Sequence, residues 1–129
     1  KAEQILPGDD VAIIGCGNIL GNCLEAASVL QDKKIQCSVV NMHTIKPIDK
    51  EKIKDIARKK KLIVTVEEHN IFGGLGSSVA EVLAGERNNC KLVRVGINDF
   101  YSSGGSYEYL KNIYGLSVEK IIETVLKNL

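Results

Sequence analysis

The sequence has few aromatic residues and lacks tryptophan. Four Tyr and two Phe among 129 residues argue against the aromatic stacking surfaces that bind single-stranded nucleic acid. The net charge is only +1, from 17 basic and 16 acidic residues, so overall charge does not indicate nucleic acid or an acidic membrane surface as a partner. No apolar run approaches the about 18 residues that a membrane-spanning helix needs. We therefore expect no nucleic-acid partner and no membrane partner.

The sequence also lacks the cysteine patterns of metal and redox sites. Its four cysteines, at 16, 23, 37 and 90, form no C-x-x-C pair and have no zinc-ligand spacing with a histidine. We expect reduced, mostly buried thiols and a cytoplasmic protein. No secretory signal sequence is recognisable, and the chain begins with Lys1 in place of Met. We expect residues 1–129 to form a single domain that is a fragment of a larger protein.

What the sequence does contain is a regular alternation of strand-like and helix-like segments. This alternation, at a spacing of about 25–30 residues, predicts an α/β domain with a parallel sheet and helices on both faces. Asp49 is a plausible N-cap for a helix whose apolar stripe is Ile53, Ile56 and Ala57. The other expected segments are strands at 11–15, 35–42, 62–66 and 91–95, an edge strand within 2–6, and helices at 19–30, from Ser77 to Ala84, and at 118–129 with Ser117 as cap.

A basic run, Arg58-Lys59-Lys60-Lys61, stands where the helix after Asp49 is expected to end. Positive charge at that place offsets the negative end of the helix dipole. We prefer this interpretation to an anion-binding patch.

The first glycine-rich turn, 15–21, follows a strand and opens a helix, as in a dinucleotide-binding fingerprint. Its third glycine comes one residue late, and the next strand ends in Asn41-Met42-His43 without the acid that binds a ribose. We therefore interpret the turn as a tight, closely packed connection rather than an NAD site.

A second glycine-rich turn contains Gly73, Gly74, Gly76 and Ser77. It lacks the Gly-Lys-Ser/Thr ending of a P-loop, so no lysine is placed for a phosphate. Its backbone N–H groups are still able to hold a carboxylate or phosphate. The alternative is that the glycines only ease the start of a helix.

Polar residues gather at the expected carboxyl edge of the sheet. His43 follows one strand, and Glu67, Glu68 and His69 follow another; if the first strand lies centrally, Asn18 lies between them. Glu67 and His69 share a strand face and are able to pair. A hydrogen-bonded cluster that shapes a domain interface is the preferred reading, and an acid/base site, a metal site and a Cys16–His dyad are alternatives.

Three segments together resemble the C-terminal domain of transketolases. They are 41–49 (NMHTIKPID), 66–77 (VEEHN followed by GGLGS) and the tail from Gly96 to Leu116. Their order and spacing hold from about Asp9 to the C-terminus. The segments resemble in particular the C-terminal subunits of split bacterial and archaeal transketolases, a family whose domain is shared by deoxyxylulose-phosphate synthases and 2-oxo acid dehydrogenase E1 components.

The resemblance implies a three-layer α/β/α fold with a mostly parallel five-stranded sheet. It also implies a parent enzyme that uses thiamine diphosphate and Mg²⁺ to transfer two-carbon ketol units between sugar phosphates. The cofactor lies between other domains of that family, and the sequence Gly8-Asp9-Asp10 departs from the family's G-D-G motif. The catalytic, cofactor-binding and metal-binding residues therefore map onto nothing in this chain.

We accordingly expect a domain that is inactive alone and packs against the pyrimidine-binding and diphosphate-binding domains or subunit of a homodimer or heterotetramer. A regulatory module for a small anion or nucleotide is the alternative function, and a hydrolase or redox enzyme using Cys16 is a third. The residues expected to form the interface or anion site are Asn18, His43, Glu67, His69, Gly73, Gly74, Gly76 and Ser77.

Overall fold

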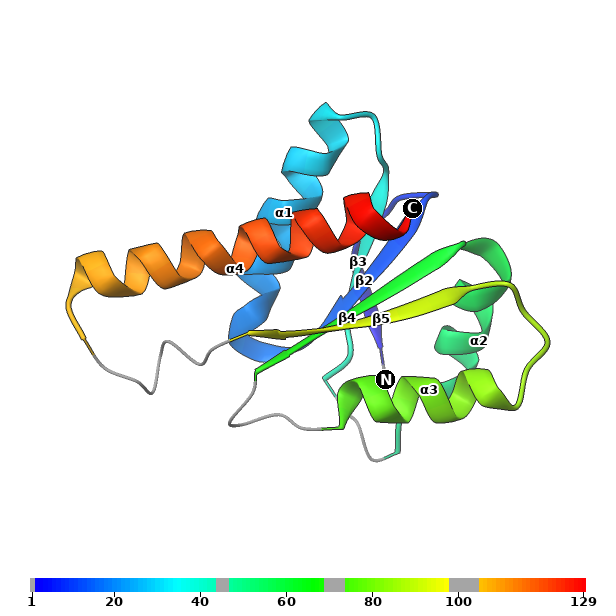
Figure 1. The fold of residues 1–129 in the computed structure, drawn as a ribbon. Coiled ribbons are helices and arrows are strands. Elements are labelled where there is room, and N and C mark those ends of the chain that lie inside the picture. The colour runs from blue at the N-terminus through cyan, green and yellow to red at the C-terminus, as the bar shows by residue number, and fades with distance from the viewer. Residues whose placement is uncertain (1, 44–46, 69–73, 98–104) are drawn as a thin grey trace.

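The chain folds around one five-stranded sheet, seen in a computed structural model that describes residues 2–43, 47–68, 74–97 and 105–129 (Figure 1). The strand order is β1-β3-β2-β4-β5; β1 is antiparallel to β3, and the other pairs are parallel. The strands are β1 (Glu3–Leu6), β2 (Val11–Gly15), β3 (Cys37–Asn41), β4 (Leu62–Glu68) and β5 (Lys91–Ile97). The helices are the 3₁₀ turn η1 (Gly17–Ile19), α1 (Leu20–Asp32), α2 (Lys50–Lys59), α3 (Leu75–Ala84) and α4 (Tyr107–Asn128).

Helices cover both faces of the sheet, which makes three layers (Figure 1). Helices α1 and α4 pack together on one face, and α2 and α3 pack on the other. Every residue of β2 is buried. Because side chains alternate along a strand, Val11 and Ile13 enter the core under α1 and α4, whereas Ala12 and Ile14 enter the core under α2 and α3. The predicted α/β class and the predicted mostly parallel five-stranded sheet are confirmed.

Several local predictions are also confirmed. Asp49 is the N-cap of α2, and its carboxylate accepts a hydrogen bond from the Lys52 backbone N–H at 3.1 Å. The segment near the N-terminus is an edge strand, β1. Helix α3 begins at Leu75, two residues before the predicted start at Ser77.

The prediction for the final helix is wrong at its start. Helix α4 begins at Tyr107 with Ser106 as N-cap, not at Val118 with Ser117 as cap. The Ser117 hydroxyl instead donates to the Ile113 carbonyl oxygen one turn earlier, at 2.9 Å. Gly115 lies inside the helix, where a glycine costs only about 1 kcal/mol relative to alanine. The segment before Gly115 therefore continues the helix.

Candidate functional site

The strand order brings the predicted site residues to one edge of the sheet. Strand β2 lies between β3 and β4, so the turn after Gly15 lies between His43, which follows β3, and Glu67, which ends β4. This is the central position predicted for Asn18. Asn18 and His43 are exposed, and Glu67 is half-buried. The predictions for His69 and Gly73 lie outside the described residues.

Glu67 is bound to the start of helix α3. Its two carboxylate oxygens accept hydrogen bonds from the backbone N–H groups of Leu75, at 3.2 Å, and Gly76, at 3.0 Å. Gly74, the N-cap residue, has no side chain to do this and adopts φ +96°, a conformation that suits glycine. The carboxylate of a neighbouring strand therefore supplies the helix cap, and its negative charge faces the positive end of the helix dipole. The turn was predicted to be able to hold a carboxylate, and the carboxylate that it holds is the chain's own Glu67 side chain.

Gly76 and Ser77 have a further partner, Arg94 of β5, which the sequence analysis did not identify. The Arg94 guanidinium Nη1 donates to the Ser77 hydroxyl at 3.2 Å. A Cβ atom on Gly76 would stand 2.7 Å from Cδ of Arg94, so the glycine makes room for the arginine stem. No spacing rule in the sequence connects Arg94 to this turn, because the two meet only through the pairing of β4 with β5.

Glu68 differs from Glu67 because it points to the opposite face and is buried, with 2% of its surface exposed. Strand alternation places it with Val64 and Val66, so its direction was readable from the sequence. The pKa of the Cys16 thiol is raised, mainly because the thiol is buried and to a smaller extent because Glu68 and then Glu67 place negative charge near it. Cys16 therefore stays protonated at neutral pH, which disfavours the predicted alternative in which it is a nucleophile.

The turn after β2 is the tightly packed connection that was predicted. A Cβ atom on Gly15 would lie 3.2 Å from Cδ1 of Ile19 and 3.3 Å from Sγ of Cys23. Gly17 has φ +70°, which again suits glycine. Within the described part of the chain, no three His, Cys, Asp or Glu side chains are grouped so that they could hold a metal ion.

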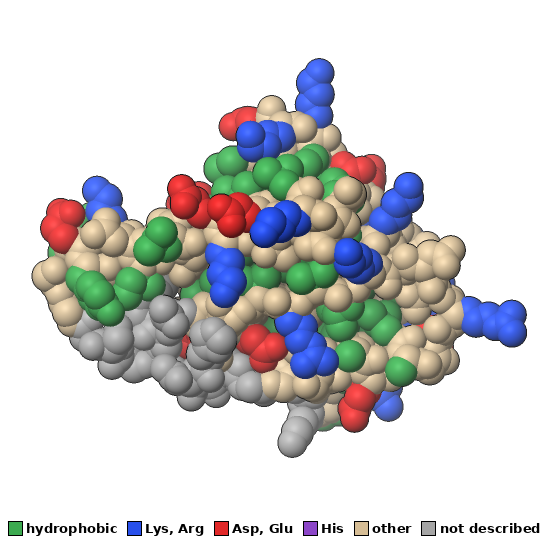
Figure 2. All heavy atoms as spheres, viewed as in Figure 1, with side chains coloured by type: hydrophobic (Ala, Val, Ile, Leu, Met, Phe, Trp, Pro, Cys, Tyr) green, Lys and Arg blue, Asp and Glu red, His purple; other side chains and the backbone are tan. Residues whose placement is uncertain are grey.

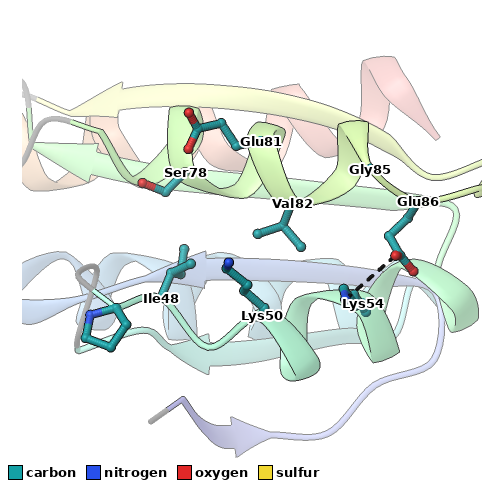
Figure 3. A pocket seen from close by; sticks show the side chains of 9 residues that line it. Ile48, Lys50, Lys54, Ser78, Glu81, Val82, Gly85 and Glu86 are labelled. Atoms are coloured by element: carbon teal, nitrogen blue, oxygen red, sulfur yellow. Dashed lines mark ion pairs between the residues drawn. The ribbon is translucent and has the colours of Figure 1, made fainter.

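A groove of about 530 Å³ lies between α2 and α3 on the other side of the molecule from α4 (Figure 3). Ile48 and Val82 give it an apolar surface, and Figure 3 shows Lys50 pointing into it from α2. At one end, Glu86 forms ion pairs with Lys54, at 3.8 Å, and Arg58, at 3.7 Å. The sequence analysis did not predict this groove, although Ser78 and Val82 of α3 and its C-cap residue Gly85 follow one another at helical spacing.

Comparison with known protein families identifies the family of this domain. The profile of the family described as "Transketolase, C-terminal domain" matches residues 1–121. The chain belongs to this family.

The curated relatives of this transketolase C-terminal domain include two of the three kinds of enzyme named by the resemblance. A "Putative transketolase C-terminal section" from Methanocaldococcus jannaschii is 40% identical over 129 residues, which is 100% of this chain and 40% of the relative. A 1-deoxy-D-xylulose-5-phosphate synthase from Heliobacterium modesticaldum is 40% identical over 121 residues, which is 94% of this chain and 19% of that enzyme.

A solved structure titled "Split gene transketolase, inactive beta4 tetramer" has the same fold. It superposes with a TM-score of 0.81 at 39% identity, and the match covers 100% of this chain and 42% of that chain. The transketolase C-terminal domain described here thus spans about two fifths or less of the length of these similar proteins. None of the helices in the described ranges has the length and apolar character needed to cross a membrane.

Replacing Glu67 should destabilise the start of α3. We expect Glu67→Ala to lower the free energy of unfolding by about 1–3 kcal/mol, because the partly buried backbone N–H groups of Leu75 and Gly76 lose a charged acceptor. Glu67→Gln should cost less, since the amide keeps one acceptor oxygen. Urea denaturation measures the loss, and hydrogen exchange of the Leu75 and Gly76 amides locates it. Glu25→Ala, at an exposed site on α1, is the control; equal losses in both alanine variants would contradict this assignment.

The raised thiol pKa values predict slow and strongly pH-dependent alkylation. Burial raises the pKa of Cys23 to about 12 and that of Cys90 to about 11, and the pKa of Cys16 is also raised. Because only the thiolate reacts, iodoacetamide should modify Cys16 more slowly than free cysteine at pH 7. The rate should rise about tenfold per pH unit from pH 7 to 9 without a plateau. Peptide mass spectrometry checks this, and a plateau for Cys16 below pH 8 would restore the nucleophile hypothesis.

Proposed function

We propose that this chain is the non-catalytic C-terminal part of a transketolase-like enzyme. The parent enzyme would use thiamine diphosphate and Mg²⁺ to transfer two-carbon ketol units between sugar phosphates. The observation that carries the proposal is the family match over residues 1–121, in a chain that covers only 40% of its Methanocaldococcus jannaschii relative. The catalytic domains then belong to the remaining part of the protein or to another subunit.

The geometry of the carboxyl edge supports a structural role for it. A diphosphate is favourably bound by free N–H groups at a helix N-terminus. Here the Glu67 carboxylate already engages those of Leu75 and Gly76, and its charge would repel the cofactor's diphosphate. The residues present therefore do not fit thiamine diphosphate.

We propose that this edge packs against the pyrimidine-binding domain. The contact includes Asn18, His43 and the turn at Gly74–Ser77, together with the predicted residues His69 and Gly73 and the loop 44–49. Exposed polar groups beside a rigid, capped helix start make a surface of fixed shape, which suits docking between domains of a homodimer or heterotetramer.

The first half of α4 offers a second contact surface for the same partner. Tyr107, Tyr109 and Leu116 are 75%, 49% and 66% exposed, whereas the residues of α4 that are buried begin only at Ser117. Figure 2 shows apolar side chains gathered at this end of the helix, and Figure 1 shows it extending beyond the sheet. Large apolar side chains gathered on an exposed surface mark protein contact sites.

We favour the transketolase reaction over the deoxyxylulose-phosphate synthase reaction and a 2-oxo acid dehydrogenase. The structure titled as a split-gene transketolase matches the whole chain with a TM-score of 0.81. The regulatory anion-binding alternative at the carboxyl edge is less favoured, because Glu67 places negative charge at the helix start that would bind the anion.

Calorimetric titration of the isolated chain with thiamine diphosphate and excess Mg²⁺ tests the cofactor part of the proposal. We expect no binding heat, because the α3 N–H donors are engaged by Glu67. Tight, Mg²⁺-dependent binding would place part of the active site in this chain and overturn the proposal.

A pair of variants on α4 tests the assembly role. We expect Leu116→Ser to change the stability of the isolated chain by less than about 0.5 kcal/mol, because Leu116 is largely exposed. In the assembled enzyme it should weaken subunit or domain association about tenfold, measured by analytical ultracentrifugation, and lower ketol transfer at limiting protein concentration. Leu126→Ser, 45% exposed at the other end of α4, is the matched control. Equal effects of the two variants, or no effect of Leu116→Ser on assembly, would contradict the proposal.

A further inference from the structure

Basic side chains converge at the edge of the sheet opposite to the predicted site. A hollow of about 460 Å³ is bordered by the end of α2 and the start of β4, and by the connection from α3 to β5. Figure 1 shows these two connections at the same end of the sheet, away from the grey segments. We call this feature the basic hollow; its lining residues are Ala57, Arg58, Lys59, Lys60, Lys61, Arg87, Asn88 and Asn89. Five of the 17 basic residues of the chain thus gather at one place, although the net charge is only +1.

The two sides of the basic hollow are held together by backbone and amide hydrogen bonds. The Lys91 N–H donates to the Lys61 carbonyl oxygen at 2.8 Å, which joins the two connections. The Asn88 side chain donates to the carbonyl oxygens of Leu83, at 3.5 Å, and Glu86, at 3.4 Å, and accepts from the Cys90 N–H at 2.9 Å. Asn88 therefore fixes the connection that carries Arg87, so the cations come together through the fold and not through a flexible tail.

The positive charge at the basic hollow exceeds what the helix ends require. Glu86 pairs with Arg58 and Asp55 pairs with Lys59. Lys60, Lys61 and Arg87 form no ion pair with any residue in the described ranges. Two helix C-termini, those of α2 and α3, lie beside the hollow and contribute about one negative charge between them. The run 58–61 alone suggested that its positive charge offsets the helix dipole. That interpretation does not account for three unpaired cations, because Arg87 comes from the connection between α3 and β5.

The chemistry of the basic hollow indicates the kind of partner. Small phosphate ligands favour helix N-termini, where free N–H groups point at them. The helix ends here present carbonyl groups, and four of the five cations are exposed, whereas Lys60 is half-buried. The groove of Figure 3 lies beyond the Arg58–Glu86–Lys54 ion pairs, so the charged surface continues into an apolar one. A polypeptide segment fits such an open, elongated surface better than a small enclosed ligand.

We propose that the basic hollow binds an acidic segment of a protein partner. Carboxylates of that segment pair with Arg87, Lys60 and Lys61, and the Arg87 guanidinium is able to hold one carboxylate through two parallel hydrogen bonds. This proposal does not rest on the proposed function, since it uses neither the carboxyl edge nor α4.

An octaglutamate peptide with a fluorescent label tests the proposal on the intact chain. Fluorescence anisotropy at low ionic strength should show saturable binding of one peptide per chain, and the affinity should fall as salt is added. The double variant Lys60→Gln/Arg87→Gln should weaken binding about tenfold or more. The double variant Lys33→Gln/Lys111→Gln removes the same charge at two exposed sites, one just after α1 and one on α4, and should leave the affinity within about twofold. In NMR spectra, the amide signals of Lys61, Arg87 and Asn88 should shift on binding.

Three outcomes would overturn the proposal. Equal losses of affinity in the two double variants would show a diffuse effect of net charge. Signals that shift only near Gly17 and Gly74 would place the peptide at the carboxyl edge. Inorganic pyrophosphate that binds the basic hollow more tightly than the peptide would show a small-phosphate site in place of a protein-binding surface.

Discussion

Strand β2 must be buried on both sides, and the rest of the architecture depends on this constraint. It is a continuous apolar run, VAIIG, and its alternating side chains enter two separate cores. Each core needs its own helical layer, because one sheet face cannot be covered by helices from the other side. The parallel pairing on both edges of β2 then requires crossover helices, which α1 and α2 supply. The three layers and the position of the carboxyl edge follow from this one strand.

The carboxyl edge illustrates how a place suited to ligands is used for stability. In many α/β proteins the N–H groups at such a helix start bind a ligand anion. In this chain, the anion is the Glu67 carboxylate, and Arg94 lies over the same turn. The Leu75 and Gly76 N–H groups are therefore engaged within the chain, in keeping with the structural role proposed for this edge in a domain whose relatives are two or more times longer.

Much of the fold could be predicted from the sequence because its signals are local. Apolar runs marked the central strands, and Asp49 marked the start of α2. The start of α4 was missed because its first ten residues contain no fully buried side chain, although the half-buried Leu110, Ile113 and Tyr114 already continue the helical spacing. The capping role of Glu67 and the position of Arg94 were also out of reach, since both depend on how β4 and β5 bring distant residues to α3. Likewise, nothing in the run 58–61 indicates that Arg87 lies beside it.

Helix α4 has two halves that differ in what stabilises them. At about 1.5 Å per residue its 22 residues extend about 33 Å, but Val118, Ile121 and Val125, which anchor it in the core, all lie in the second half. The first half has the Ser106 cap and, in place of fully buried residues, the half-buried apolar side chains Leu110, Ile113 and Tyr114, of which Tyr114 packs against the core. Opening of the first half should therefore cost less free energy than opening of the second, and a molecule that covers it changes the local unfolding equilibrium as well as the exposed area. Through this linkage, occupancy of one end of the helix is coupled to order in the first turns of α4 that follow the Ser106 cap.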